Sequence, residues 1–326
     1  MKSVADPLSP VQDERYAGTA MPRGAATGGC RRQAFVVFTE FGKFLMLENG
    51  LVVITGGAGH LGLACAQRFR ERRLLITDGN ATRLGEAATT LAHDGVDVTS
   101  LVADITVPEG ACEIARTAAR LGQWSVLIHT AGVAPPTAPE TIVAVNLFGT
   151  INILEAFQAS LVPGATGVCL ASLAAYRSLA SEFDEATTNP RGDPHDFVAH
   201  MAKRFPAVSS GRLAYSVSKR GTIQQVRKRA SLWAQRGARL VSVSPGIIAD
   251  TAMGRQRASQ VQQADDLPRD VRLGASSEIA AAVWLATSAD AVLINGIDIL
   301  VDGGYLAAVD TAYSASQRSD WHNLRV

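Results

Sequence analysis

The sequence predicts an α/β protein built on a doubly wound parallel sheet, formed by a single domain with an insertion after its fifth strand. Seven short apolar runs alternate with helix-like segments, and the middle runs are almost continuously hydrophobic, as in strands covered on both faces. The first run leads directly into a glycine-rich turn. The expected strands are Leu51–Thr55, Leu74–Thr77, Val98–Ala103, Ser125–Thr130, Gly167–Ser172, Arg239–Val243 and Ile297–Val301. The expected helices include Leu61–Glu71, Ala81–His93, Gly110–Leu121, Pro139–Leu161 and Leu213–Gln235.

The domain plan follows from composition. A chain of 326 residues with 47% hydrophobic and 19% charged residues suits one globular domain with additions. Residues 1–45 are predicted to be a disordered N-terminal extension, because Gly, Ala, Pro and Arg dominate its first part without an apolar period. We expect the folded domain over residues 46–308 and a C-terminal tail over 309–326. Translation from Met46 is an open alternative.

Charge and cysteine usage exclude several classes of protein. The formal net charge of +1 gives no basis for a nucleic-acid or anionic-membrane surface. Four cysteines without a CxxC pair, and no secretory signal, predict reduced thiols in a cytoplasmic protein. The six histidines are scattered, so no metal site is expected.

The first strand runs into TGGAGHLG, residues 55 to 62, and then into a helix. Glycines at this position let backbone N–H groups approach a pyrophosphate at the helix N-terminus. The second strand is followed by Asp78, nineteen positions after Gly59, where a carboxylate accepts the ribose hydroxyls of NAD and repels the 2′-phosphate of NADP. This favours NAD over NADP. Arg83 is a nearby cation that works against the argument, and a plain turn role for Asp78 in DGN is the alternative.

The stretch YSVSK places Tyr215 and Lys219 four positions apart on one predicted helix, hence on one face. An ammonium about 4 Å from a phenol favours the phenolate by roughly 4 kcal/mol at an effective dielectric near 20, before any discount for solvent. At about 1.4 kcal/mol per unit, that moves the pKa of the tyrosine toward ~7, where an acid/base catalyst works best. The alternative is a solvated helix face.

Several further motifs accompany these two. They are Asp104–Ile105, Thr130–Ala131–Gly132, Asn146, Ser172, SPGII followed by Thr251, and INGIDILVDGG. Together with the glycine-rich turn, Asp78 and YSVSK, they resemble the short-chain dehydrogenase/reductase family over roughly Leu51 to Gly304. The resemblance is to its compact, single-domain Rossmann branch. The stretch from YSVSK to SPG looks particularly like bacterial 3α-hydroxysteroid dehydrogenase/carbonyl reductase relatives.

The resemblance implies an NAD-dependent oxidoreductase that interconverts a secondary alcohol and a ketone, with a hydroxysteroid or other bulky alicyclic substrate and a dimeric or tetrameric assembly. It implies that Tyr215 is the general acid/base, that Lys219 lowers its pKa, that Ser172 positions the substrate oxygen and that Asn146 completes a proton relay. The implied cofactor contacts are Gly56, Gly59, Leu61, Gly62, Asp78, Asp104, Ile105, Ala131, Gly132, Tyr215, Lys219, Pro245, Gly246, Ile248 and Thr251.

Two departures from the family pattern keep alternatives open. The glycine spacing TGxxGxxG is typical of the extended, nucleotide-sugar-modifying branch, so a nucleotide-sugar epimerase or dehydratase is a second hypothesis. A non-catalytic NAD(P)-sensing protein is a third. In addition, Thr130 stands where the family commonly has Asn, which leaves a strand-bracing side-chain contact open.

The third departure is an insertion of about 173–212, because Ser172 and Tyr215 lie much further apart than in most compact members. We expect part of it to cover the substrate cleft, with Phe183, Phe197, Met201 and Phe205 as an apolar lining. A polar surface excursion is the alternative. A second cover is expected over Ala252–Asp270.

Overall fold

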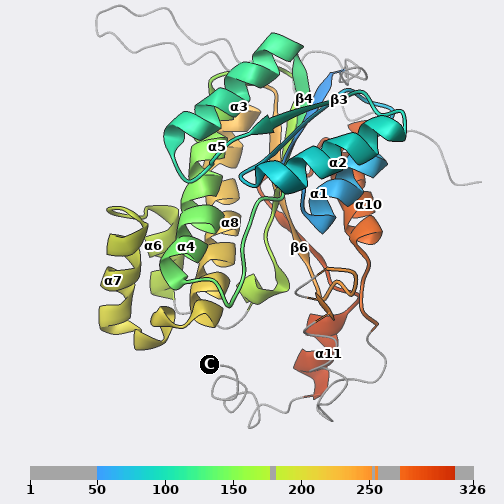
Figure 1. Ribbon diagram of the computed structural model, residues 1–326. Coiled ribbons are helices and arrows are strands. Elements are labelled where there is room, and N and C mark those ends of the chain that lie inside the picture. Colours follow the sequence, from blue (N-terminus) through green and yellow to red (C-terminus); the bar gives the residue numbers. More distant parts are fainter. Residues whose placement is uncertain (1–49, 177–180, 252–253, 256–271, 313–326) are drawn as a thin grey trace, which may run out of the picture. The chain divides into compact units, whose positions relative to one another are not determined.

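The computed structural model describes residues 50–176, 181–251, 254–255 and 272–312 (Figure 1). The predicted N-terminal extension, the alternative start at Met46, almost all of the second cover and the tail beyond residue 312 lie outside the described residues.

The described residues contain one seven-stranded sheet with the order β3-β2-β1-β4-β5-β6-β7, in which every pair of neighbours is parallel. The strands are β1 (Leu51–Thr55), β2 (Leu74–Asp78), β3 (Val98–Val102), β4 (Trp124–His129), β5 (Thr166–Leu170), β6 (Arg239–Pro245) and β7 (Asp298–Val301). The chain moves outward from β1 to β3 and then crosses back to β4. The carboxyl ends of β1 and β4 therefore form the switch point at which such sheets bind ligands.

Helices cover both faces of the sheet, with α1, α2 and α10 on one side and α3, α5 and α8 on the other (Figure 1). Their bounds are α1 His60–Arg68, α2 Ala81–His93, α3 Pro108–Leu121, α4 Pro139–Val143, α5 Gly149–Gln158, α6 Ser181–Thr188, α7 Pro194–Arg204, α8 Gly211–Ala234, α10 Ser276–Thr287 and α11 Tyr305–Ala312. Short 3-10 turns are η2 (Leu173–Tyr176), η3 (Pro206–Ser209) and η4 (Ala289–Ala291). The predicted doubly wound α/β fold is confirmed.

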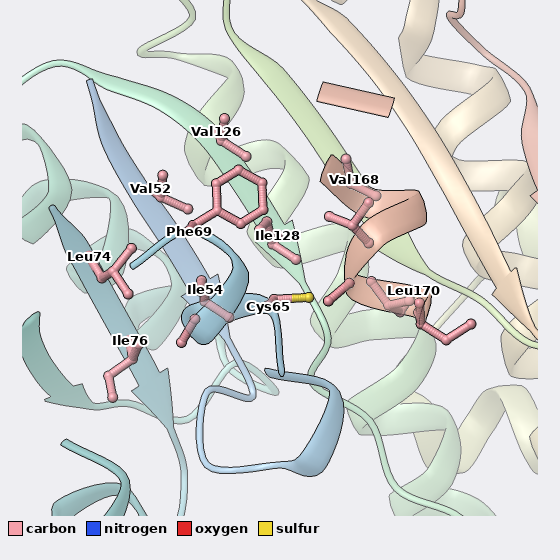
Figure 2. Close-up of a cluster of buried hydrophobic side chains, with 14 of the residues drawn as sticks. Val52, Ile54, Cys65, Phe69, Leu74, Ile76, Val126, Ile128, Val168 and Leu170 are labelled. Carbon is pink, nitrogen blue, oxygen red and sulfur yellow. The ribbon is translucent and has the colours of Figure 1, made fainter. Parts of the chain in front are cut away.

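The central strands are almost continuously hydrophobic because their side chains are buried alternately on two faces. Val52 and Ile54 belong with Phe69 to the cluster on the α1 side (Figure 2), whereas Val53 belongs to the cluster on the opposite face, which includes Phe157 of α5. Burying one such side chain contributes about 2 kcal/mol, so the two clusters on either side of the sheet fix its register.

The predicted helix Pro139–Leu161 is interrupted by a π-helical segment, η1 (Ala144–Phe148). The segment contains Asn146, whose buried amide bonds to the backbone of Val133 in the loop after β4. The combined stretch Pro139–Gln158 is long and apolar enough to cross a membrane by length and composition, with a mean hydropathy of 1.3, but half of it is buried inside the protein. We therefore assign it to the core of the domain.

The insertion is largely helical and forms a core of its own. Phe183 of α6 and Phe197 and Met201 of α7 are buried together with Ile142 of α4 and Val217 of α8. Polar contacts fix the arrangement, because Arg220 of α8 donates to both oxygens of Asp184 in α6, at 2.6 and 2.8 Å. The insertion is thus bound to the outer side of α4 and α8 (Figure 1).

The C-terminal helix α11 begins directly after the DGG motif. Asp302 caps it, since its two carboxylate oxygens accept from the N–H groups of Gly304 and Leu306 at 2.9 and 2.8 Å. Gly303 and Gly304 have φ angles of 64° and 83°, a conformation that favours glycine. The predicted boundary at residue 308 therefore falls inside a helix.

Candidate active site

Two adjoining cavities lie at the carboxyl ends of β1 and β4, with volumes of about 290 and 350 Å³. They share Gly59, Thr130, Gly132 and Val133 as lining residues. Every predicted cofactor contact lines one of them. Leu61, Gly62, Tyr215, Lys219, Pro245, Gly246, Ile248 and Thr251 line the first cavity, Gly56, Asp78, Asp104, Ile105 and Ala131 line the second, and Gly59 and Gly132 line both.

The glycine-rich turn fits a dinucleotide because it has no room for side chains. Gly56 has a φ of +70°, and a Cβ there would meet the backbone N of Ala131 at 2.6 Å. A Cβ on Gly62 would meet the carbonyl oxygen of Gly56 at 2.3 Å. The turn therefore packs directly on the loop after β4 and leads into α1, whose N-cap is Gly59. Backbone N–H groups at such a helix N-terminus can hold phosphate oxygens.

Asp78 lines the second cavity at the end of β2, with 13% of its side chain exposed. One carboxylate oxygen accepts from the N–H of Asn80 at 2.9 Å and lies 3.7 Å from the guanidinium of Arg83. The turn role and the position facing the cavity are therefore both present. Arg83, the cation that works against a preference for NAD, lines the same cavity.

Ser172, Tyr215 and Lys219 line the first cavity together. Lys219 is 5% exposed and donates to the carbonyl of Leu170 at 2.8 Å. Burial lowers the pKa of Lys219 from 10.5 to about 8, and the opposing effect of Cys169 is smaller. The solvated-face alternative for the Tyr–Lys pair is therefore wrong, since the lysine is inside the protein. Ser172 follows the last residue of β5 by two positions, and its hydroxyl accepts from the N–H of Ala174 at 3.1 Å.

Asn146 does not line either cavity among the residues described. Its Oδ1 accepts from the N–H of Val133 at 2.8 Å, and its Nδ2 donates to the carbonyl of Val133 and to Ser218 Oγ. Asn146 thus braces the loop that separates the two cavities. Asn146 is a structural brace between η1 and the loop after β4, whereas its part in a proton relay stays a prediction.

A buried histidine that the sequence analysis left unassigned joins the first turn to this asparagine. Thr150 donates to the carbonyl of Asn146 at 2.6 Å, so its oxygen accepts from His129 Nε2, 3.0 Å away. His129 Nδ1 then accepts from the hydroxyl of Thr55 at 2.6 Å. Burial, assisted by the charge of Lys219, lowers the pKa of His129 from 6.5 to about 3 and keeps the ring neutral.

The neighbouring Thr130 makes a side-chain contact that braces two strands, although it stands where the family commonly has Asn. Its hydroxyl donates to the carbonyl of Thr55 at 2.8 Å and thereby joins β4 to the end of β1. A short hydroxyl replaces the longer amide that the family commonly uses here.

The substrate side of the first cavity was only partly predicted. Lining residues that the sequence analysis did not name individually include Val133, Ala134, Leu173, Ala174, Tyr176, Tyr305 and Leu306. Position in the chain was the available signal, since these residues follow the TAG motif, Ser172 and the DGG motif. From the described insertion only its first turn, η2, lines the cavity. The prediction that Phe183, Phe197, Met201 and Phe205 line it is wrong, because these side chains pack against α4 and α8 instead.

Comparison with known proteins agrees with this geometry. Residues 50–180 match the family model described as short chain dehydrogenase, and residues 200–306 match the one described as Enoyl-(Acyl carrier protein) reductase. The chain is 34% identical over 279 residues to short-chain dehydrogenase/reductase bsc3 of Alternaria brassicicola, which covers 80% of this chain and 97% of that protein. It is 26% identical to 3-alpha-hydroxysteroid dehydrogenase/carbonyl reductase of Comamonas testosteroni, over 71% of this chain and 95% of that protein.

Among solved structures, the RhlG/NADP active-site complex of Pseudomonas aeruginosa superimposes with a TM-score of 0.62 at 20% identity, covering 81% of this chain and 99% of that one. These relatives do not favour the nucleotide-sugar alternative. The chain therefore belongs to the short-chain dehydrogenase/reductase family and is an oxidoreductase acting on alcohol- or ketone-type substrates with a nicotinamide cofactor.

Proposed function

We propose that this protein is an NAD-dependent oxidoreductase that interconverts a secondary alcohol and a ketone. One observation carries the proposal: Ser172, Tyr215 and Lys219 line the same cavity as the glycine-rich turn. A hydroxyl donor, a phenol and a buried ammonium around one cavity can orient a carbonyl oxygen and supply or accept its proton.

When bound, the nicotinamide ring supplies the hydride acceptor or donor. Tyr215 transfers the proton of the substrate hydroxyl, and Ser172 holds the substrate oxygen by a hydrogen bond. Lys219 favours the ionised phenol by its charge and would hold the cofactor ribose. Its own lowered pKa, about 8, means that this charge is lost as the pH rises above that value.

Replacing the proposed acid/base tests this function. We expect Tyr215→Phe to lower turnover by about 10²- to 10⁴-fold while NADH still binds, because the change removes one hydroxyl from the cavity. The assay follows oxidation of NADH and NADPH with a panel of cyclic ketones, and binding is measured by NADH fluorescence. Ser216→Ala is the matched control on the same helix, since the Ser216 hydroxyl donates to the carbonyl of Arg212. Wild-type turnover by Tyr215→Phe would refute the assignment.

The preference for NAD rests on Asp78. Its carboxylate at the second cavity favours ribose hydroxyls and repels a 2′-phosphate, although a structural neighbour was solved with NADP. We expect Asp78→Ala to raise the kcat/KM ratio of NADPH over NADH by roughly tenfold or more. Asp97→Ala, at a position 74% exposed, should leave the ratio unchanged. An unchanged ratio in Asp78→Ala would remove the basis for NAD.

The lining of the first cavity supports a neutral, bulky alicyclic substrate such as a hydroxysteroid. Val133, Ala134, Leu173 and Leu306 give an apolar wall, and Lys219 is the one charged side chain among its described lining residues. An apolar wall without a second cation suits a ring ketone better than a phosphorylated substrate. The name of the Comamonas testosteroni relative points in the same direction.

We also propose a homo-oligomer in the cytoplasm. Large apolar side chains are exposed on α10 and along the approach to the edge strand β7, namely Trp284, Leu285, Val292, Leu293 and Ile297. Leu293 is 95% exposed, and such a concentration suits burial against another subunit. Light scattering during size-exclusion chromatography tests the assembly.

The proposed location in the cytoplasm is supported by the free cysteines Cys65, Cys112 and Cys169, which suit a reducing compartment.

A further inference from the structure

Tyr176 has an unusual place in the first cavity. It ends the η2 turn, four residues after Ser172, and lines the cavity beside Leu173 and Ala174. Its ring also packs on a small buried cluster formed by Ala171, Ala175 and Ile223. The side chain therefore separates the cavity from the protein interior.

The hydroxyl of Tyr176 is bound to a carboxylate rather than left free for a ligand. It donates to Oδ2 of Asp298 in the edge strand β7 at 2.6 Å. Burial, followed by this bond, raises the pKa of Tyr176, so the phenol remains a donor at neutral pH. With its hydroxyl bonded to Asp298, Tyr176 is held as an apolar wall of the cavity.

The carboxylate itself is held in a specific environment. Asp298 stands beside Ser242 of β6 in the sheet register, and its Oδ1 is buried without a hydrogen-bond partner among the described residues. Arg220 and Arg227 of α8 also act on Tyr176 by their charge. A carboxylate oxygen buried without a partner costs free energy, and the bond from Tyr176 satisfies the other oxygen of the same group.

We propose that Tyr176 is a specificity-determining residue of the substrate cavity and that Asp298 is the positioning residue that fixes its ring. The inference rests on the proposed alcohol/ketone function and deepens it. The fixed ring limits the length of the apolar body that a cyclic ketone can place opposite Ser172 and Tyr215. Removing the Tyr176 hydroxyl or the Asp298 carboxylate leaves the Tyr176 ring free to move. Removing the ring itself enlarges the cavity on this side.

The test compares affinities for cyclohexanone and the two-ring 2-decalone by calorimetry at saturating oxidised NAD, so that no turnover occurs. We expect Tyr176→Ala to raise the affinity for 2-decalone relative to cyclohexanone by roughly tenfold. Tyr176→Phe and Asp298→Ala should each give the same smaller shift, and the double variant should give no more than either alone. Asp298→Asn keeps an acceptor and should restore the wild-type ratio. Asp290→Ala, at an exposed position, is the matched control.

The outcomes separate this inference from the proposed function. The expected affinity shifts without any turnover by the wild-type protein with NADH would support Tyr176 as the wall and overturn the redox proposal. Turnover with the same affinity ratio in every variant would overturn the role of Tyr176 alone. A larger shift in the double variant than in its single variants would overturn the role of Asp298. Failure of the wild-type protein to bind either ketone would overturn both.

Discussion

His129 provides a quantitative test of the buried polar chain beneath the site. Its ring is fully enclosed, and its pKa is lowered from 6.5 to about 3, chiefly by burial. The unfolded chain therefore binds a proton at a higher pH than the folded protein does. The contribution of the neutral His129 ring to the unfolding free energy is fully present above pH 6.5, and it is lost as the pH falls from 6.5 toward 3.

The expected loss can be worked out from these two values. At about 1.4 kcal/mol per pH unit inside this window, lowering the pH from about 7 to about 4.5 should cost roughly 2.6 kcal/mol of unfolding free energy through this one group. Carboxyl groups also titrate near the lower limit, but they are the same in a matched variant and cancel in the difference.

The assay is urea unfolding of wild type and His129→Gln over this pH range. We expect the variant to be less stable at neutral pH, because its neighbours lose hydrogen bonds, and to have a slope flatter by about 1 kcal/mol per pH unit. His93→Gln, at a side chain 90% exposed, should keep the wild-type slope. Equal slopes for wild type and His129→Gln would refute the claim that a buried neutral imidazole links Thr55 to Thr150.

Two further substitutions test the turn and the insertion. Gly62→Ala should weaken NADH binding by about tenfold or more, measured by fluorescence titration, because its Cβ would meet the Gly56 carbonyl at 2.3 Å. Gly85→Ala, with no neighbouring atom within 4 Å, should bind NADH like the wild type, and equal loss in both variants would contradict the reasoning. Arg220→Met should lower the unfolding free energy by about 1 kcal/mol and speed amide exchange in α6, since Asp184 loses a two-point contact. Unchanged exchange in α6 would show that the apolar cluster alone holds this helix.

The fold could be predicted because its signals are local. Continuous apolar runs mark strands buried on both faces, and the turn TGGAGHLG marks the switch point, so the order of elements followed from the sequence. The cavity lining by Tyr215 and Lys219 followed for the same reason, since four positions along a helix share a face.

The remaining features depend on contacts between distant segments. The π turn at Asn146 and the chain through His129 arise from packing between helix and loop, which no spacing in the sequence reports. The four apolar residues of the insertion were expected to line the substrate cleft, whereas they pack against α4 and α8. Hydrophobic periodicity shows that a face is covered without showing what covers it.

The apolar cluster that the insertion helices α6 and α7 form with α4 and α8 has a consequence for engineering. Ala214 and Val217 stand on either side of Tyr215 on α8, and the insertion shields both from water. Shortening the chain to the Ser172–Tyr215 spacing of compact relatives would remove these covering helices and expose apolar side chains on α8 beside the Tyr215 phenol. The smallest unit able to hold Tyr215 in place therefore includes α6 and α7, and a shortened version should be isolated as an aggregate rather than as a faster enzyme.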